Sequence, residues 1–139
     1  MAQTQKPTAL GYGEIAKRMG TAGDATGSCV KSVVGLTGAC TAAEASTFAN
    51  PGGATKLAAN GFTLVDADSV VTSTTTATDD TVELDHVFTC TGAQSVTGFA
   101  IENDDDDVVF AECCFDAAIP FETNDTLTLE MKMQFKLGA

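Results

Sequence analysis

His86 is the only histidine of the chain, so a Ser-His-Asp or Cys-His mechanism would have to use this side chain. It lies in a stretch, residues 81–91, in which alternate residues are apolar, and this places it on the same strand face as Leu84 and Phe88. A histidine among apolar neighbours is more often a half-buried structural residue, with its ring nitrogens bonded to the backbone, than a catalyst. No Gly-x-Ser-x-Gly turn is present to supply a nucleophile. We therefore expect a structural His86, no catalytic residue and no cofactor.

A zinc site would need four converging side chains, and the candidates are His86, Cys90, Cys113 and Cys114. On one extended strand His86 and Cys90 would lie about 13 Å apart, at a rise of about 3.3 Å per residue, which is too far for one ion. Cys113 and Cys114 are neighbours in sequence and therefore point to opposite faces of a strand. The spacing argues against a structural metal.

The cysteines are odd in number and irregular in spacing, which is not typical of a disulfide framework. Buried free thiols that pack as small apolar side chains are the expected state. The five residues are Cys29, Cys40, Cys90, Cys113 and Cys114.

Four consecutive aspartates, Asp104, Asp105, Asp106 and Asp107, are weak candidates for a cation site, because hard cations prefer oxygen ligands. The pattern lacks the glycine and the spaced glutamate of an EF-hand loop, and a solvated turn is the more frequent role of such a run. Sugar-binding sites usually present exposed aromatic rings, and this chain has no Trp and one Tyr.

The formal charge of −12, from 19 acidic and 7 basic residues, repels phosphate backbones and anionic lipid surfaces. No basic cluster is larger than the pair Lys17 and Arg18. We expect no direct nucleic-acid binding and no membrane binding. The first residues lack the apolar core of a signal peptide, and no apolar run has membrane-spanning length, which predicts a protein made in the host cytoplasm and soluble there.

The last part of the chain alternates between apolar and polar residues from 126 to 137, the pattern of a strand with one buried face. That face would pack either on the core of the same chain or on a second copy. Its members are Leu127, Leu129, Met131, Met133, Phe135 and Leu137.

Further strands are predicted where β-branched and apolar residues cluster or alternate between turn residues. Two of them flank the aspartate run and should form a hairpin with an acidic tip, while Pro120 marks a loop and Asn124 with Asp125 a turn. These strands cover residues 30–36, 62–71, 81–91, 95–102 and 108–115.

Three short helices are expected in the first half of the chain. Residues 11–19 have apolar residues at helical spacing before Gly20. Residues 41–48 begin with the Thr-x-x-Glu pattern of a capping box, and residues 54–59 would add one more helical turn.

Together these elements predict a mainly β chain, an antiparallel β-sandwich or small barrel with one to three short helices in the N-terminal half. Residues 1–10 would form an N-terminal arm and residues 11–139 a single β-rich domain. The core is rich in Ala and Val rather than in large side chains, so contacts between copies would add stability.

The order of these segments resembles that of a group of small β-rich virion structural proteins of tailed bacteriophages and tailed archaeal viruses. The segments that carry the likeness are an amphipathic helix, a Gly-rich strand with its loop, an apolar hairpin and a closing strand introduced by Asp-Thr-Leu-Thr. In this chain they are residues 11–19, 33–45, 95–101 with 108–115, and 124–137.

The resemblance implies a non-enzymatic structural role in a virion, with no catalytic residues to carry over. The expected function is a head-surface component, a decoration or vertex protein, that forms a homo-oligomer on the major capsid protein or on a neighbouring virion protein. A tail-associated structural protein is the nearest alternative. A receptor- or carbohydrate-binding β-sandwich is the alternative from another class, and a small hydrolase that uses His86 is a more distant one.

Overall fold

The structure is a computed structural model that describes residues 3–7, 31–73, 81–103 and 108–134. In these ranges the chain forms nine strands and one short 3₁₀ turn, and it contains no α-helix. The elements are β1 (Gln3–Pro7), β2 (Ser32–Thr37), η1 (Pro51–Gly53), β3 (Thr55–Lys56), β4 (Val65–Asp66), β5 (Ser69–Ser73), β6 (Thr81–Thr89), β7 (Gln94–Glu102), β8 (Val109–Phe121) and β9 (Thr126–Gln134).

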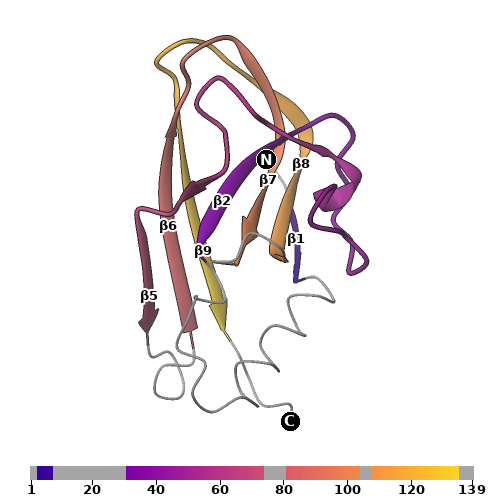
Figure 1. Cartoon of the computed structure of the whole chain (residues 1–139), viewed down its shortest axis with the longest axis vertical. Helices are drawn as coiled ribbons and strands as arrows, with labels where there is room; N and C mark the ends of the chain where they lie inside the picture. The colour runs from indigo at the N-terminus through magenta and orange to yellow at the C-terminus, as the bar shows by residue number, and fades with distance from the viewer. Residues whose placement is uncertain (1–2, 8–30, 74–80, 104–107, 135–139) are drawn as a thin grey trace.

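The strands form two sheets, and every strand pair is antiparallel (Figure 1). Sheet A has the order β1-β8-β7-β2-β3, with β4 also paired to β2, and sheet B has the order β5-β6-β9. The fold is therefore mainly β and antiparallel, as the alternating sequence pattern predicts. The N-terminal residues 3–7, expected to be an extended arm, pair with residues 111–115 of β8.

Sheet B follows directly from the period-two pattern of its two long strands. β6 pairs with β9 along nine consecutive residue pairs, from Thr81 opposite Gln134 to Thr89 opposite Thr126, without a bulge. Leu84, His86 and Phe88 are buried on one face of β6, while the residues between them are exposed or partly exposed. One face of this sheet is thus dry and the other is wet, as the residue types require.

The main core lies between the two sheets. It combines Phe88, Leu129 and Met131 of sheet B with Val33, Ile101 and Phe110 of sheet A, among other buried side chains. Phe62 is fully buried. Its ring packs at a tilt against those of Phe88 and Phe121, with ring centroids 5.4 Å and 5.1 Å away. These rings supply the bulk that the Ala- and Val-rich strands lack.

The opposite face of sheet A is also buried, because the chain between β2 and β4 folds back over it. We call residues 38–64 the cover segment; it contains η1 and β3. Val34, Leu36, Ala54, Ala100 and Val109 form a second core there, with Phe48 and Leu64 packed against it. Sheet A is consequently dry on both faces where the cover segment lies over it, and β2 is buried along Ser32 to Leu36. The second half of β8, from Asp116 to Ala118, is exposed.

The helices predicted for residues 41–48 and 54–59 are wrong. The first range forms turns, and the second contains β3. The capping box fails because the Thr41 N–H donates to the carbonyl of Gly52 and the Ala43 N–H donates to Glu112, so the segment bonds across to other parts of the chain rather than along itself. The helix predicted at residues 11–19 lies outside the described residues.

Two strand boundaries also differ from the prediction. The strand expected at residues 62–71 divides into β4 of sheet A and β5 of sheet B. The chain crosses between the sheets at residues 67 and 68. There the N–H of Ala67 donates to the carbonyl of Lys31, and the N–H of Asp68 donates to the carbonyl of Asp85. Pro120 lies within β8, opposite Ser95, instead of in a loop. A proline is tolerated there because β1 reaches only residues 111–115 of β8, so its missing N–H breaks no pairing with β1.

Burial of the β9 face predicts a specific cost for truncating it. Leu129 is 2% exposed in the main core, so Leu129→Ala should lower the free energy of unfolding by about 2 to 5 kcal/mol, through lost burial and the cavity left behind. The neighbouring Thr128 is exposed, and Thr128→Ala should change it by no more than about 0.5 kcal/mol. Urea denaturation of the two variants measures the difference, and equal stabilities would contradict the inward orientation of Leu129.

Candidate functional site

His86 is buried in β6 and has one aromatic and one acidic neighbour. Its ring meets Phe88 edge-on at 4.5 Å, and its Nδ1 lies 3.3 Å from Oδ2 of Asp68. The same Asp68 oxygen accepts a hydrogen bond from the backbone N–H of Val87 at 2.8 Å. The neighbour of Nδ1 is therefore a side-chain carboxylate and not the backbone group we expected. Because Asp68 stands where the chain crosses from sheet A to sheet B, this contact fastens that crossing.

The cysteines are not all free thiols, which corrects the sequence expectation. Cys40 of the cover segment forms a disulfide with Cys114 of β8, with a Cα–Cα distance of 5.5 Å and a sequence separation of 74. Cys90 and Cys113 are buried free thiols, and both belong to the main core. Cys113 and Cys114 do point to opposite faces of their strand, one into the core and one to the cover segment. Cys29 lies outside the described residues.

The proposed metal-ligand types do not come together in the part of the chain that the structure describes, since no group of three or more His, Cys, Asp or Glu side chains is placed to hold an ion there. Of the zinc candidates, Cys114 is taken up by the disulfide. Asp104, Asp105, Asp106 and Asp107 lie outside the described residues.

The first of two buried polar clusters centres on Glu112 of β8, which is 2% exposed. Its Oε1 accepts hydrogen bonds from the backbone N–H of Ala43 and from the hydroxyl of Ser46, both at 2.6 Å. The Ser46 oxygen in turn accepts a hydrogen bond from the N–H of Gly52 at 3.0 Å. Hydrogen bonds to a buried carboxylate are stronger than neutral ones, so this cluster ties three points of the cover segment to sheet A.

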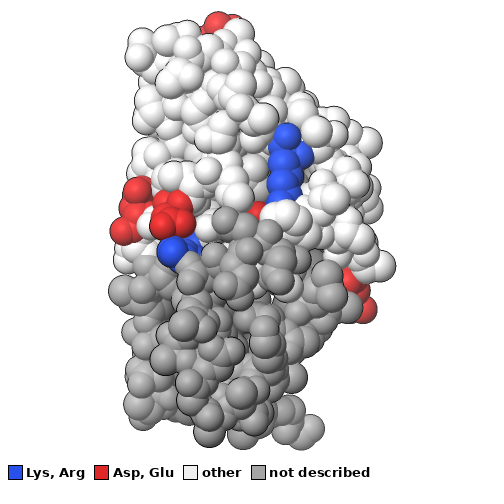
Figure 2. Space-filling model, viewed as in Figure 1, with Lys and Arg blue, Asp and Glu red and all other residues white. Residues whose placement is uncertain are grey.

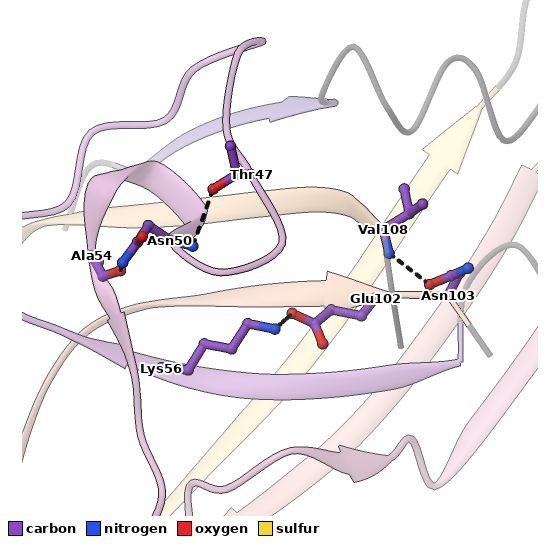
Figure 3. A network of polar contacts seen from close by, with 7 residues as sticks. All are labelled: Thr47, Asn50, Ala54, Lys56, Glu102, Asn103 and Val108. Carbon is purple, nitrogen blue, oxygen red and sulfur yellow. Dashed lines mark hydrogen bonds and ion pairs between the residues drawn. The ribbon is translucent and has the colours of Figure 1, made fainter. Parts of the chain in front are cut away.

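The second cluster pairs Lys56 of β3 with Glu102 of β7, as Figure 3 shows. Glu102 is fully buried, and the Lys56 side chain is 19% exposed. The Lys56 ammonium also lies 3.2 Å from the centre of the Phe48 ring, a cation–π contact. The lysine therefore links a carboxylate of sheet A to an aromatic ring of the cover segment.

Hydrogen bonds between residues close in sequence hold the turns next to this pair (Figure 3). The N–H of Asn50 donates to the Thr47 hydroxyl, and the Asn50 side-chain amide donates to the carbonyl of Ala54. At the end of β7, the Asn103 side-chain oxygen accepts a hydrogen bond from the N–H of Val108 at 2.9 Å. These bonds close the turn before β3 and the approach to the hairpin tip.

The two clusters and the disulfide lie on the same face of sheet A, and we refer to them together as the clamp. Its members are Cys40, Ser46, Phe48, Lys56, Glu102, Glu112 and Cys114. The carboxylates face internal donors under a cover, an arrangement that holds a segment in place and offers little access to a substrate. The sequence analysis did not single out the two glutamates, although each interrupts or ends an otherwise apolar strand, which is the signal of a buried partnered charge.

β9, the strand whose apolar face was expected to pack on the core or on a second copy, has a dry face and lies at the edge of sheet B among the described strands. Leu129 and Met131 are buried in the main core, and Leu127 and Met133 are partly buried against it. Phe135 and Leu137 lie outside the described residues. Among the described strands, β9 pairs only with β6, so it forms one edge of sheet B.

Comparisons of the chain with protein-family models, with curated proteins and with solved structures found no match. In the described ranges, no helix is both long and apolar enough to cross a lipid bilayer.

The clamp predicts that two adjacent glycines differ in their tolerance of a side chain. Gly52 and Gly53 both have positive φ, +60° and +74°, so alanine strains the backbone at either position. At Gly52 the added Cβ would also lie 3.0 Å from the sulfurs of both Cys40 and Cys114, whereas nothing lies within 4 Å at Gly53.

Gly53→Ala should therefore lower the free energy of unfolding by about 1 kcal/mol, and Gly52→Ala by about 2 to 4 kcal/mol, because of the added crowding. Thermal unfolding of both variants under non-reducing conditions measures this. Equal losses would show that the disulfide does not pack on Gly52.

The Lys56–Glu102 pair predicts a large loss when its cation is removed. Lys56→Met should lower the free energy of unfolding by about 3 kcal/mol or more, because a fully buried carboxylate loses its ionic partner. The matched control is Lys31→Met. Lys31 lies 3.6 Å from Asp66 with 42% and 66% of the two side chains exposed, so this change should cost no more than about 1 kcal/mol. Denaturant titration compares them, and similar losses would exclude a stabilising role for the buried pair.

Proposed function

We propose that the chain is a non-enzymatic structural protein of a tailed-virus particle, a decoration or vertex component of the head surface that assembles as a homo-oligomer on the major capsid protein. The structural observation that carries the proposal is the combination of a clamped β-sandwich with one long strand, β9, that lies at a sheet edge among the described strands. The likeness of residues 11–137 to small virion proteins supports the address on a virus particle.

The clamp supports a structural role rather than a catalytic one. Proteins that must keep one shape outside a cell gain from links that constrain the unfolded chain, and the Cys40–Cys114 disulfide closes a long loop. Disulfides persist in oxidising surroundings, which suits a protein that leaves the host cytoplasm as part of a particle.

The distribution of charge supports assembly through apolar and backbone contacts. On the face shown in Figure 2, acidic and basic side chains occupy a few small areas, in places next to one another, and the rest of the described surface is uncharged. The whole chain nevertheless carries a formal charge of −12, so copies repel one another at long range and must be drawn together by short-range contacts. Such a surface keeps free subunits soluble and leaves the choice of neighbour to shape and strand pairing.

The proposed location on the head surface is tested on virus particles from infected cells that express the chain from the viral genome. A gold-labelled antibody against the chain should mark the heads of intact particles at regular positions. Label on tails only would support the tail-associated alternative. Absence of the chain from washed particles would overturn the proposed function.

Self-association is tested by sedimentation velocity across a salt series. Added salt should shift the protein towards the oligomer, because screening weakens repulsion between subunits that each carry a formal −12. The screening length falls from about 10 Å at 0.1 M salt to about 3 Å at 1 M. A monomer at every salt and protein concentration would count against a homo-oligomeric component.

A further inference from the structure

We propose that two copies of this chain pair through the edge of β9 that no described strand occupies, antiparallel and around a two-fold axis at Met131, to join their two B sheets into one sheet of six strands. This inference deepens the proposed function and rests on its homo-oligomeric part, because it names the surface and the register of self-association. It takes a second copy of the chain as the partner.

β9 is the longest edge strand among the described residues, and it is regular. It has nine residues, contains neither proline nor glycine, and pairs with β6 without a bulge. The other edges among the described strands are shorter: β3 and β4 have two residues each, and β1 and β5 have five. Long regular edges invite pairing with another chain, and natural monomers usually shorten or interrupt them.

The burial pattern restricts the registers that are possible. Leu129 and Met131 point to the dry face, while Thr128, Glu130 and Lys132 point to the wet face. A shift by one residue would set dry positions opposite wet ones, so odd residues must pair with odd and even with even. The two-fold axis must therefore pass through a single residue of β9.

Charge then favours the register with the axis at Met131 over the neighbouring registers. With the axis at Met131, Glu130 of each copy stands opposite Lys132 of the other, which gives two opposite-charge pairs. With the axis at Glu130 or at Lys132, a like-charge pair forms at the centre of the interface. Directly opposed side chains of opposite charge stabilise an antiparallel pair, and like charges destabilise it. An axis at Leu129 would leave both charges opposite threonines.

The monomer itself leaves Glu130 in an unfavourable setting that this register corrects. Within sheet B, Glu130 stands directly opposite Asp85 of β6, so two carboxylates face each other on the wet side. Lys132 stands opposite Glu83, with Lys132 Nζ 3.4 Å from Glu83 Oε2. A second copy in the Met131 register would place a lysine on the open side of Glu130 and so offset its repulsion from Asp85.

The dry face of β9 also gains from the pairing. Leu127 and Met133 are only partly buried against the main core, in contrast to Leu129 and Met131. The Met131 register brings Met133 of one copy opposite Leu129 of the other and continues the apolar face across the axis. Apolar surface that a single copy leaves partly wet would thereby be covered.

The register is tested by cross-linking two variants that each gain one cysteine, Glu130→Cys and Lys132→Cys, under mild oxidation. In the proposed register positions 130 and 132 of different copies stand opposite each other, at a Cα–Cα distance of about 4.5 to 5.5 Å, within disulfide range. Position 130 is diagonal to itself at about 7 to 8 Å, which is too far. The mixture of the two variants should give a covalent dimer on a non-reducing gel, and each variant alone should give several-fold less.

The unmodified protein is the control for the native cysteines, and Thr128→Cys alone is the control for random collision on the same face. A dimer formed equally well by Glu130→Cys alone would overturn the Met131 register. Absence of a cross-link from every sample would overturn pairing through β9.

A charge exchange provides a second measurement that needs no new thiol. Glu130→Lys and Lys132→Glu each turn both proposed pairs into like-charge pairs, and should weaken dimerisation about tenfold or more in sedimentation equilibrium at low salt. The double variant Glu130→Lys/Lys132→Glu restores opposite charges and should recover most of the affinity. Circular dichroism checks that each variant is folded.

Failure of this inference can be told apart from failure of the proposed function. A homo-oligomer that survives with no cross-link and no response to the exchanged charges would place the contact elsewhere and leave the virion role intact. A chain that is monomeric in solution but found at regular positions on particles would remove the β9 dimer together with self-association, and would leave the location on the particle intact. A β9 dimer absent from particles would remove the virion role alone.

Discussion

The covering of sheet A depends on the requirement that a carboxylate buried in a sheet must find donors. Glu102 and Glu112 lie on the face of sheet A that turns away from the main core, and both are almost completely shielded from water. An uncompensated charge in that position would cost several kcal/mol, about the whole stability of a small domain. The cover segment supplies the compensation through Lys56, Ser46 and the N–H of Ala43, so its path is dictated by these two acids.

The disulfide reinforces the same arrangement from the next position on the outer face of β8. Glu112 and Cys114 are two residues apart and therefore point to the same side, where one takes hydrogen bonds from the cover segment and the other bonds covalently to Cys40. Gly52 passes close to both sulfurs and donates to Ser46, which joins the two attachments. Because this part of the face is filled, the strand edges, the wet face of sheet B and the exposed second half of β8 remain for contact with other molecules. This is the physical reason for looking at β9 as an assembly element.

The prediction from sequence is good where structure is local and poor where it depends on distant partners. The structure confirms the hairpin of β7 and β8 and the strands β6 and β9. Their signals, an alternation of apolar and polar residues and a turn residue, lie within about ten residues of sequence. The strand expected at residues 62–71 is a different case. Its residues suit a strand, but nothing local says that the chain leaves sheet A at Ala67 and enters sheet B at Ser69.

The amino-acid sequence by itself determined the β class, the division of β9 into an apolar and a polar face, and the strong negative charge, since each follows from residue type and spacing alone. Only the tertiary structure decided that residues 41–48 belong to the cover segment and form no helix. It also decided that Cys40 pairs with Cys114 and that Lys56 pairs with Glu102. A capping box adds about 1 kcal/mol to a helix, and the buried acids and the disulfide outweigh it once the strands are assembled. Those partners are separated by 74 and 46 residues, so no local pattern records their meeting. The tertiary structure also decides that β9 lies at the edge of sheet B among the described strands, because a strand becomes an edge only when the rest of the sheet has formed.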